Sequence, residues 1–254
     1  MRLTLLLCLL AAPFAAAPRA VAATNHPVVA IIIDDLGNNR ALDERAIALP
    51  GPVACAFLPH TPYAAELARQ AHDAGKEVLL HLPLAAMHHE KLGPGGLTLH
   101  MTRREFVATV LSDLAAIPDL DGVNNHMGSL LTQHPGDMAW LMETLKQSPA
   151  LFYVDSRTTS RTVAYEIATE YGVPATSRDV FLDDVQTEAA VARQLRRLIQ
   201  IAKRRGAAVA IGHPYPVTLK VLKKRLPTLK AAGVRLVPVR AVIARQALRL
   251  TTAR

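Results

Sequence analysis

Cysteine and aromatic residues are scarce in this sequence of 254 residues. There are two cysteines, Cys8 and Cys55, and Phe, Trp and Tyr together make up 4% of the chain. So few cysteines exclude the disulfide framework that holds many small secreted domains together. Cys55 lies in an apolar run, so we expect it to be a buried small hydrophobe. The scarcity of aromatic side chains argues against nucleic acid as a partner, because stacking on such side chains is a main way of binding single strands.

Long apolar runs are also missing, except at the beginning of the chain. Residues 1–23 combine a basic start at Arg2, the apolar stretch Leu3–Ala17 and the small-residue end Ala20–Ala23, which is typical of a secretory signal peptide. Because the apolar stretch is short for a membrane span, we expect it to be cleaved, leaving residues 24–254 as an exported, periplasmic or secreted protein without a stable membrane span. An uncleaved membrane anchor is the alternative.

Basic residues exceed acidic ones, and the formal net charge is +8, to which Arg2 and Arg19 of the predicted signal peptide contribute. Much of the excess lies in residues 193–205 and 220–230, where cations recur at helical spacing with leucine and isoleucine between them. This pattern is typical of the solvated faces of amphipathic helices. An alternative use of these clusters in an exported protein is contact with anionic envelope polymers or lipid headgroups.

From residue 28 onward, short apolar runs alternate with longer amphipathic runs. We expect strands at 28–33, 53–57, 77–82, 122–124, 151–154, 180–182, 207–211 and 235–237. We expect helices at 39–49, 63–74, 103–116, 137–147, 162–171, 187–205 and 217–232. Strands that alternate with helices imply a parallel sheet with right-handed crossovers. Because this unit repeats along the whole chain, a closed or nearly closed (β/α) barrel in a single α/β domain is favoured over an open sheet.

Two adjacent carboxylates, Asp34 and Asp35, follow the most apolar of these runs, Val28–Ile33. Such a run is typical of a strand buried on both faces, and active sites of parallel α/β folds gather where such strands end. Two like charges side by side repel each other, and a bound cation offsets that cost. The pair therefore indicates metal binding or acid and base chemistry. The alternative is that one Asp caps a helix beginning near Asn38 while the other faces water.

Most other predicted strands also end in residues that can bind a metal or move a proton. These residues are His60, His81, His126, Asp155, Asp183 and His213. One His beside a strand is more often a hydrogen-bonded structural residue than a ligand, but that explanation does not account for the repetition. Because the carboxyl ends of parallel strands meet at one rim, the pattern indicates the carboxylates and imidazoles of a hydrolytic metal site.

Six ordered motifs resemble those of the divergent polysaccharide deacetylases, and they cover essentially the whole chain after the predicted signal peptide. They are Ile-Ile-Asp-Asp-Leu-Gly at 32–37, His-Leu-Pro at 81–83, Asn-Asn-His-Met-Gly-Ser at 124–129, Asp-Ser-Arg-Thr at 155–158, Arg-Asp-Val-Phe-Leu-Asp at 178–183 and Gly-His-Pro at 212–214. The resemblance implies a distorted (β/α) barrel of about seven parallel strands, related to the carbohydrate esterases that remove acetyl groups from polysaccharides. It also implies that Asp34 is the catalytic base, that Asp35 and two His hold a metal ion, and that His213 is the catalytic acid.

The second metal-binding imidazole is where this sequence departs from the better-studied relatives, whose two metal-binding His lie close together on one loop. Four residues after His81 stands Ala85 rather than His. The candidates are His126, at the next strand end, and His88 or His89, further along the same loop. We favour His126, because a strand end is held more rigidly than a loop and the asparagines before it are placed to orient the ligands.

Further polar residues at the rim are expected to orient these groups or to bind sugar hydroxyls. They are Asn125, Asp155, Arg157 and Asp179. The alternative for the charged ones is a structural role, in which Arg157 and Arg178 form ion pairs with Asp179 or Asp183 that only hold the rim together.

The expected function is therefore that of an exported, metal-dependent deacetylase. The expected metal is Zn²⁺ on the His/His/Asp set, and the expected partner is an acetylated cell-envelope polysaccharide or a peptidoglycan-like glycan. Two other classes remain open. One is an envelope carbohydrate-binding protein that uses the same rim without turnover, and the other is a metal-dependent amidase that acts on a peptide or another amide.

Overall fold

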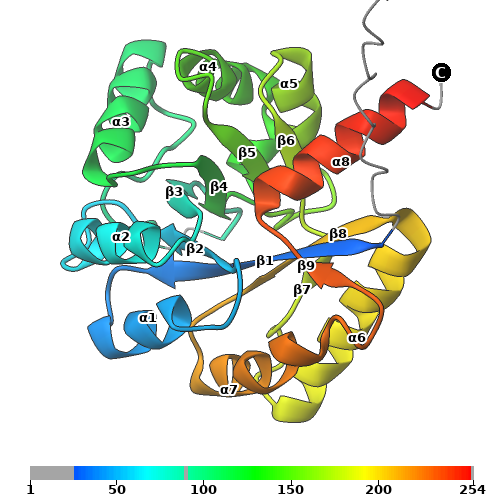
Figure 1. Cartoon of the computed structure of the whole chain (residues 1–254). Helices are drawn as coiled ribbons and strands as arrows, with labels where there is room; N and C mark the ends of the chain where they lie inside the picture. Colours follow the sequence, from blue (N-terminus) through cyan, green and yellow to red (C-terminus); the bar gives the residue numbers. More distant parts are fainter. Residues whose placement is uncertain (1–25, 89–90, 253–254) are drawn as a thin grey trace, which may run out of the picture.

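The computed structural model describes residues 26–88 and 91–252 (Figure 1). Its strands are β1 (Val28–Leu36), β2 (Ala54–Phe57), β3 (Val78–Leu84), β4 (Gly122–Met127), β5 (Phe152–Asp155), β6 (Ala175–Ser177), β7 (Val180–Phe181), β8 (Ala207–Gly212) and β9 (Arg235–Leu236). Its α-helices are α1 (Arg40–Ile47), α2 (Ala64–Asp73), α3 (Arg103–Ala116), α4 (Pro135–Leu145), α5 (Ala164–Glu170), α6 (Glu188–Arg205), α7 (Pro216–Arg225) and α8 (Val239–Thr252). The predicted signal peptide lies outside the described residues.

All paired strands are parallel, and they form one sheet in the order β6-β5-β4-β3-β2-β1-β8-β7, with β9 added beside β1. The sheet curls into an incomplete barrel, and β6 and β7 are the two ends of the strand order (Figure 1). The prediction of a distorted (β/α) barrel in a single α/β domain is confirmed. The described residues form nine strands rather than about seven.

Two apolar layers pack against the two faces of this sheet. On the outer face, alternate residues such as Val29, Ile31 and Ile33 pack against helices α1 to α7. On the inner face, the residues between them, such as Ala30 and Ile32, pack against the equivalent positions of other strands and against α8. Since successive side chains of a strand point to opposite faces, each strand contributes to both layers, which explains its unbroken apolar sequence.

Helix α8 and strand β6 have no counterpart in the sequence-based assignment. Val239, Val242 and Ile243 of α8 cover the inner layer of the sheet, and their 3-4 spacing is that of an amphipathic helix. The helix expected at 217–232 ends earlier, at Arg225, where a short 3₁₀ turn containing Pro227 follows. Proline has no backbone N–H to continue the helix, which explains the early end.

The structure also describes the surroundings of Cys55 and the apolar character of the helices. Cys55 is a free and buried cysteine within the outer layer, as expected, and burial raises the pKa of its thiol to about 12. Within residues 26–88 and 91–252, no helix combines the length and the apolar composition that a membrane span requires.

Candidate active site

A distortion near the end of β1 brings two adjacent carboxylates to one cavity. In a regular strand, Asp34 and Asp35 would point to opposite faces of the sheet. The register between β1 and β2 shifts between Ile33 and Leu36, which marks a β-bulge, and Asp35 has a positive φ of 61°. The left-handed conformation is unfavourable for residues other than glycine, so it marks a site where strain is retained. The consequence is that both carboxylates line the same cavity.

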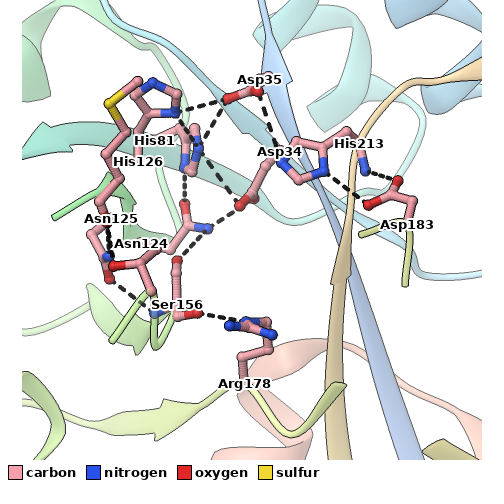
Figure 2. Close-up of polar contacts among 12 residues, drawn as sticks. Asp34, Asp35, His81, Asn124, Asn125, His126, Ser156, Arg178, Asp183 and His213 are labelled. Carbon is pink, nitrogen blue, oxygen red and sulfur yellow. Dashed lines mark hydrogen bonds and ion pairs between the residues drawn. The ribbon is translucent and has the colours of Figure 1, made fainter. Parts of the chain in front are cut away.

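Strands β3 and β4 supply the imidazoles. His81 of β3 lies directly opposite Asn124 of β4, and His126 follows two residues later on the same face of β4. This register places both imidazole rings beside Asp35 (Figure 2). The ring centroids of His81 and His126 are 4.9 Å apart, in an edge-on arrangement.

Three side-chain atoms converge as the ligands of one metal ion would. Oδ1 of Asp35 lies 3.2 Å from Nε2 of His81 and 2.9 Å from Nδ1 of His126, and the two nitrogen atoms are 3.2 Å apart. Ligands bound tetrahedrally to Zn²⁺ at 2.0 to 2.1 Å are about 3.3 Å apart, so the spacing matches. The same Asp35 oxygen is buried and has no hydrogen-bond partner among the described residues, an arrangement that a cation would complete. These residues therefore fit a divalent metal.

Asn124 links a metal-ligand candidate to the second carboxylate. Its Nδ2 donates a hydrogen bond to Oδ1 of Asp34 over 2.8 Å, and its Oδ1 lies 2.9 Å from Nδ1 of His81. A carboxylate only accepts hydrogen bonds, so the amide nitrogen must face Asp34 and the amide oxygen must face His81. The proton of a neutral His81 is then on Nδ1, which leaves the lone pair of Nε2 available for a metal.

A third imidazole enters the cavity from the end of β8. Nδ1 of His213 donates to Oδ1 of Asp183 over 3.0 Å, and Nε2 lies 3.8 Å from Oδ2 of Asp35 (Figure 2). The other oxygen of Asp183 accepts from the backbone N–H of His213 and from the hydroxyl of Thr218. Asp183 is therefore fully engaged, and it fixes both the orientation and the proton position of the His213 ring.

The charges of the cavity shift the pKa values of its carboxylates in opposite directions. Burial raises the pKa of Asp34 above its usual value, despite the nearby imidazoles. Burial would raise the pKa of Asp35 as well, but the close imidazoles of His126 and His81 hold it well below the usual range. Two adjacent carboxylates with opposite shifts suit two different roles, a proton acceptor and a permanently charged ligand.

The pKa values of the imidazoles are raised. Burial lowers the pKa of His81, but the charges of Asp34 and Asp35 outweigh it and raise the pKa to about 9. In the same way, burial lowers the pKa of His213, and the hydrogen bond to Asp183 and the charges of the Asp pair raise it above its ordinary value. A raised pKa favours the protonated form of His213, which is the form that donates a proton.

The cavity has a volume of about 420 Å³, and it gathers most of the predicted site residues. Asp34, Asp35, His81, Asn125, His126 and His213 all line it. Asn125 supports its wall from within, because Oδ1 accepts from the hydroxyl of Tyr153 and from the backbone N–H of Ser156. His88 is exposed and does not belong to the metal-ligand group, and His89 lies outside the described residues.

Three predicted site residues do not line the cavity. Asp155 accepts hydrogen bonds from the N–H of Arg157 and the hydroxyl of Thr162, and so holds the loop after β5. The side chain of Arg157 is exposed. Asp179 precedes β7, so it lies at the opposite end of that strand from the cavity. There it pairs with Arg205 and accepts a hydrogen bond from the N–H of Val209.

Other lining residues were not assigned to the site from the sequence. Ser156 and Arg178 face the cavity, and Arg178 donates to the carbonyls of Ser156 and Arg157 and covers the ring of Phe181. Among the described residues, neither Arg157 nor Arg178 forms the predicted ion pair with Asp179 or Asp183. Asp179 pairs with Arg205 instead, and Asp183 is bound to His213. Ser156 stands two residues after Val154, whose side chain lies on the inner face of the sheet. The alternation of side chains along a strand could therefore have identified Ser156 as a cavity residue.

Comparison with known proteins finds similarity along most of the chain. The family model of the divergent polysaccharide deacetylases matches residues 31–243. The uncharacterised protein YibQ of Escherichia coli is 37% identical over 214 residues, which cover 83% of this chain and 67% of that protein. An uncharacterised protein of Haemophilus influenzae is 39% identical over 201 residues, which cover 79% of this chain and 71% of that protein.

Solved structures share the fold. An uncharacterised protein of Agrobacterium tumefaciens superposes with a TM-score of 0.83 at 24% identity, covering 88% of this chain and 92% of the other. A protein of Bacillus anthracis described as a CE4 family pseudoenzyme gives a TM-score of 0.51 at 14% identity, covering 86% of this chain and 66% of the other. The family match covers most of the sequence and includes every residue of the candidate site, and the chain therefore belongs to the divergent polysaccharide deacetylase family.

Proposed function

We propose that this protein is a metal-dependent deacetylase that acts on an acetylated cell-envelope polysaccharide or a peptidoglycan-like glycan. The observation that carries the proposal is the convergence of Asp35, His81 and His126 on one point, beside a buried carboxylate and an imidazole paired with Asp183. Family membership supports an acetylated polysaccharide as the substrate. We also propose export, on the basis of the predicted signal peptide at residues 1–23.

The metal site would consist of Asp35, His81 and His126, and Zn²⁺ is the ion that such a set of ligands suits. When bound there, it would polarise the acetyl carbonyl and lower the pKa of a water molecule toward neutrality. The fixed tautomer of His81, set by Asn124, presents Nε2 for this purpose.

The proton transfers fall to Asp34 and His213. Oδ1 of Asp34 is held by Asn124, and Oδ2 lies 3.6 Å from Nε2 of His81. Oδ2 therefore faces the metal-ligand candidates, and it would take a proton from the water that attacks the acetyl carbon. The raised pKa of Asp34 makes it a stronger base than an ordinary carboxylate. As the bond between the acetyl carbon and the sugar nitrogen or oxygen breaks, protonated His213 gives its proton to the leaving group, and the products are acetate and a free amine or hydroxyl.

Acetate release tests this function. The zinc-loaded protein is incubated with acetylated chitooligosaccharide and with peptidoglycan fragments, and the acetate is measured. We expect release by the wild type and a loss of about 100-fold or more in Asp34→Asn, because a general base contributes at least that factor. Asp184→Asn is the matched control, because Asp184 lines the same cavity without touching the metal-ligand candidates.

The outcomes separate the proposal from its rivals. Glycan binding without acetate release would support a carbohydrate-binding protein without turnover. A protein described as a CE4 family pseudoenzyme shares the fold. Hydrolysis of other amides without activity on any acetylated glycan would support an amidase of another substrate class.

A further inference from the structure

Charge is distributed unevenly along the chain. Residues 186–254 contain 16 Lys and Arg and a single acidic residue, Glu188. Residues 1–185 contain the other 20 acidic residues and only 13 basic ones. Helices α6, α7 and α8 belong to the basic part, whereas the carboxylates of the candidate site belong to the acidic part. The chain therefore has two regions of opposite charge, and none of the described Lys and Arg residues of the basic region lines the catalytic cavity.

Helix α6 carries the densest group of these cations. The cationic patch, as we name it, consists of Arg193, Arg196, Arg197, Lys203 and Arg204, all of them exposed. The opposite face of α6, with Leu195, Leu198 and Ile201, is buried in the outer layer. Because the apolar face of α6 is buried against the sheet, the cationic patch on the opposite face is held toward the solvent.

The patch is continuous and has no counter-charge of its own. Arg193, Arg197 and Arg204 recur at helical spacing, so they form one row about 16 Å long. With Arg196 and two glutamines they surround a depression of about 510 Å³. None of the five cations forms an ion pair with a residue that the structure describes, whereas the ends of α6 are paired, Glu188 with Lys220 and Arg205 with Asp179.

A second group of cations lies on the helix that packs beside α6. Lys220, Lys223 and Lys224 of α7, with Arg45 of α1, line a separate depression of about 350 Å³. Helix α7 lies between α6 and α1 and contacts both (Figure 1). The cations are therefore spread over neighbouring helices of the outer layer. An array of this kind suits an extended anionic surface better than a single anionic chain.

We propose that the cationic patch docks the protein on an anionic phospholipid surface. The five unpaired cations supply the attraction, and the acidic remainder of the molecule is repelled from the same surface, so that binding has one orientation. The patch has no aromatic side chain, so it offers no stacking platform for nucleotide bases. It also has no exposed large apolar residue, so docking would be electrostatic and reversible. This inference does not depend on the proposed deacetylase activity.

Vesicle sedimentation tests the proposal with the whole protein. We expect binding to vesicles of phosphatidylcholine with about 30 mol% phosphatidylglycerol at about 50 mM salt, much weaker binding at about 300 mM salt, and none to phosphatidylcholine alone. Each cation near an anionic surface contributes about fivefold in affinity, so the triple variant Arg193→Gln, Arg197→Gln, Arg204→Gln should bind about 100-fold more weakly.

Two further variants make the test specific. A matched control removes three exposed charges elsewhere, Arg69→Gln, Arg104→Gln and Lys146→Gln, and should bind like the wild type. A charge-preserving variant, Arg193→Lys, Arg197→Lys, Arg204→Lys, should also bind like the wild type. Equal loss in the triple variant and the matched control would overturn the proposal, since net charge alone would then decide binding. Absence of vesicle binding together with salt-sensitive capture of soluble polyphosphate would overturn it in favour of an anionic polymer.

Discussion

Asn124 offers the sharpest test of how the candidate site is built. Its side chain is fully buried and bonds to His81 on one side and to Asp34 on the other. Asn124→Leu keeps the branched shape of the side chain but removes both hydrogen bonds, and the proton of His81 is then free to occupy Nε2, the nitrogen needed for the metal. Loss of an orienting partner of this kind costs about 10-fold to 100-fold in metal affinity, or about 1.4 to 2.7 kcal/mol.

Zinc affinity measured by competition with a chromophoric chelator checks this expectation directly. The control is Thr144→Val, which removes a buried hydroxyl that donates to the carbonyl of Trp140 in α4, away from the cavity. We expect the dissociation constant for zinc to rise at least about 10-fold in Asn124→Leu and to stay at the wild-type value in Thr144→Val. Circular dichroism confirms that both variants are folded. Wild-type affinity in a folded Asn124→Leu would refute the orienting role.

Three further predictions concern the proton donor and the rim. Asp183→Asn should slow acetate release about 100-fold. The alkaline limb of its pH profile should also move to lower pH, because Asp183 raises the pKa of His213. An unmoved alkaline limb would contradict this. Gly95→Ala should lower the free energy of unfolding, measured in urea, by at least about 1 kcal/mol more than Gly93→Ala. Both glycines have a positive φ, but only at Gly95 would a Cβ lie 2.2 Å from a side-chain oxygen of Asp113. Equal losses in the two variants would count against this. Burial raises the pKa of Asp113 to about 6, so the stabilisation by its protonated form is full below about pH 4 and is lost as the pH rises through 6. Asp113→Asn should reduce this pH-dependent change in the free energy of unfolding by about 1 to 2 kcal/mol. An unchanged pH dependence in urea titrations would contradict it.

Much of the fold could be predicted because its strands are short and almost wholly apolar. The run Val28–Ile33 packs on both faces, as its composition indicates, and it became the central strand β1. Strand β6 was missed because Ala175–Ser177 has neither an apolar run nor an alternating pattern. Helix α8 was missed although it has the spacing of an amphipathic helix, because the barrel pattern offered no place for a helix on the inner face of the sheet.

The residues of the site follow the alternation of the inner face. Asp34 stands two residues after Ile32, and His81 stands two residues after Leu79, so each continues an inward-facing apolar row. The same rule explains why Asp155 does not reach the cavity: it follows the inward-facing Val154 by one residue.

Two features of the site could not be derived from alternation. The bulge that turns Asp35 toward Asp34 depends on the register with β2, and no local pattern announces a positive φ at an aspartate. Asp179 was expected to orient the site or to bind sugar, but it comes before β7 and pairs with Arg205, whereas Asp183 follows that strand and holds His213.

The zinc content of the purified chain tests the central claim, that Asp35, His81 and His126 hold one metal ion. Wild-type protein, His126→Ala and His88→Ala are loaded with zinc, passed through gel filtration and analysed for metal. We expect one zinc per chain in the wild type and in His88→Ala, and a large loss in His126→Ala, because His126 lies 2.9 Å from Oδ1 of Asp35 and His88 does not belong to the metal-ligand group. Full zinc retention in His126→Ala, or loss of zinc in His88→Ala, would show that these three residues do not hold the ion.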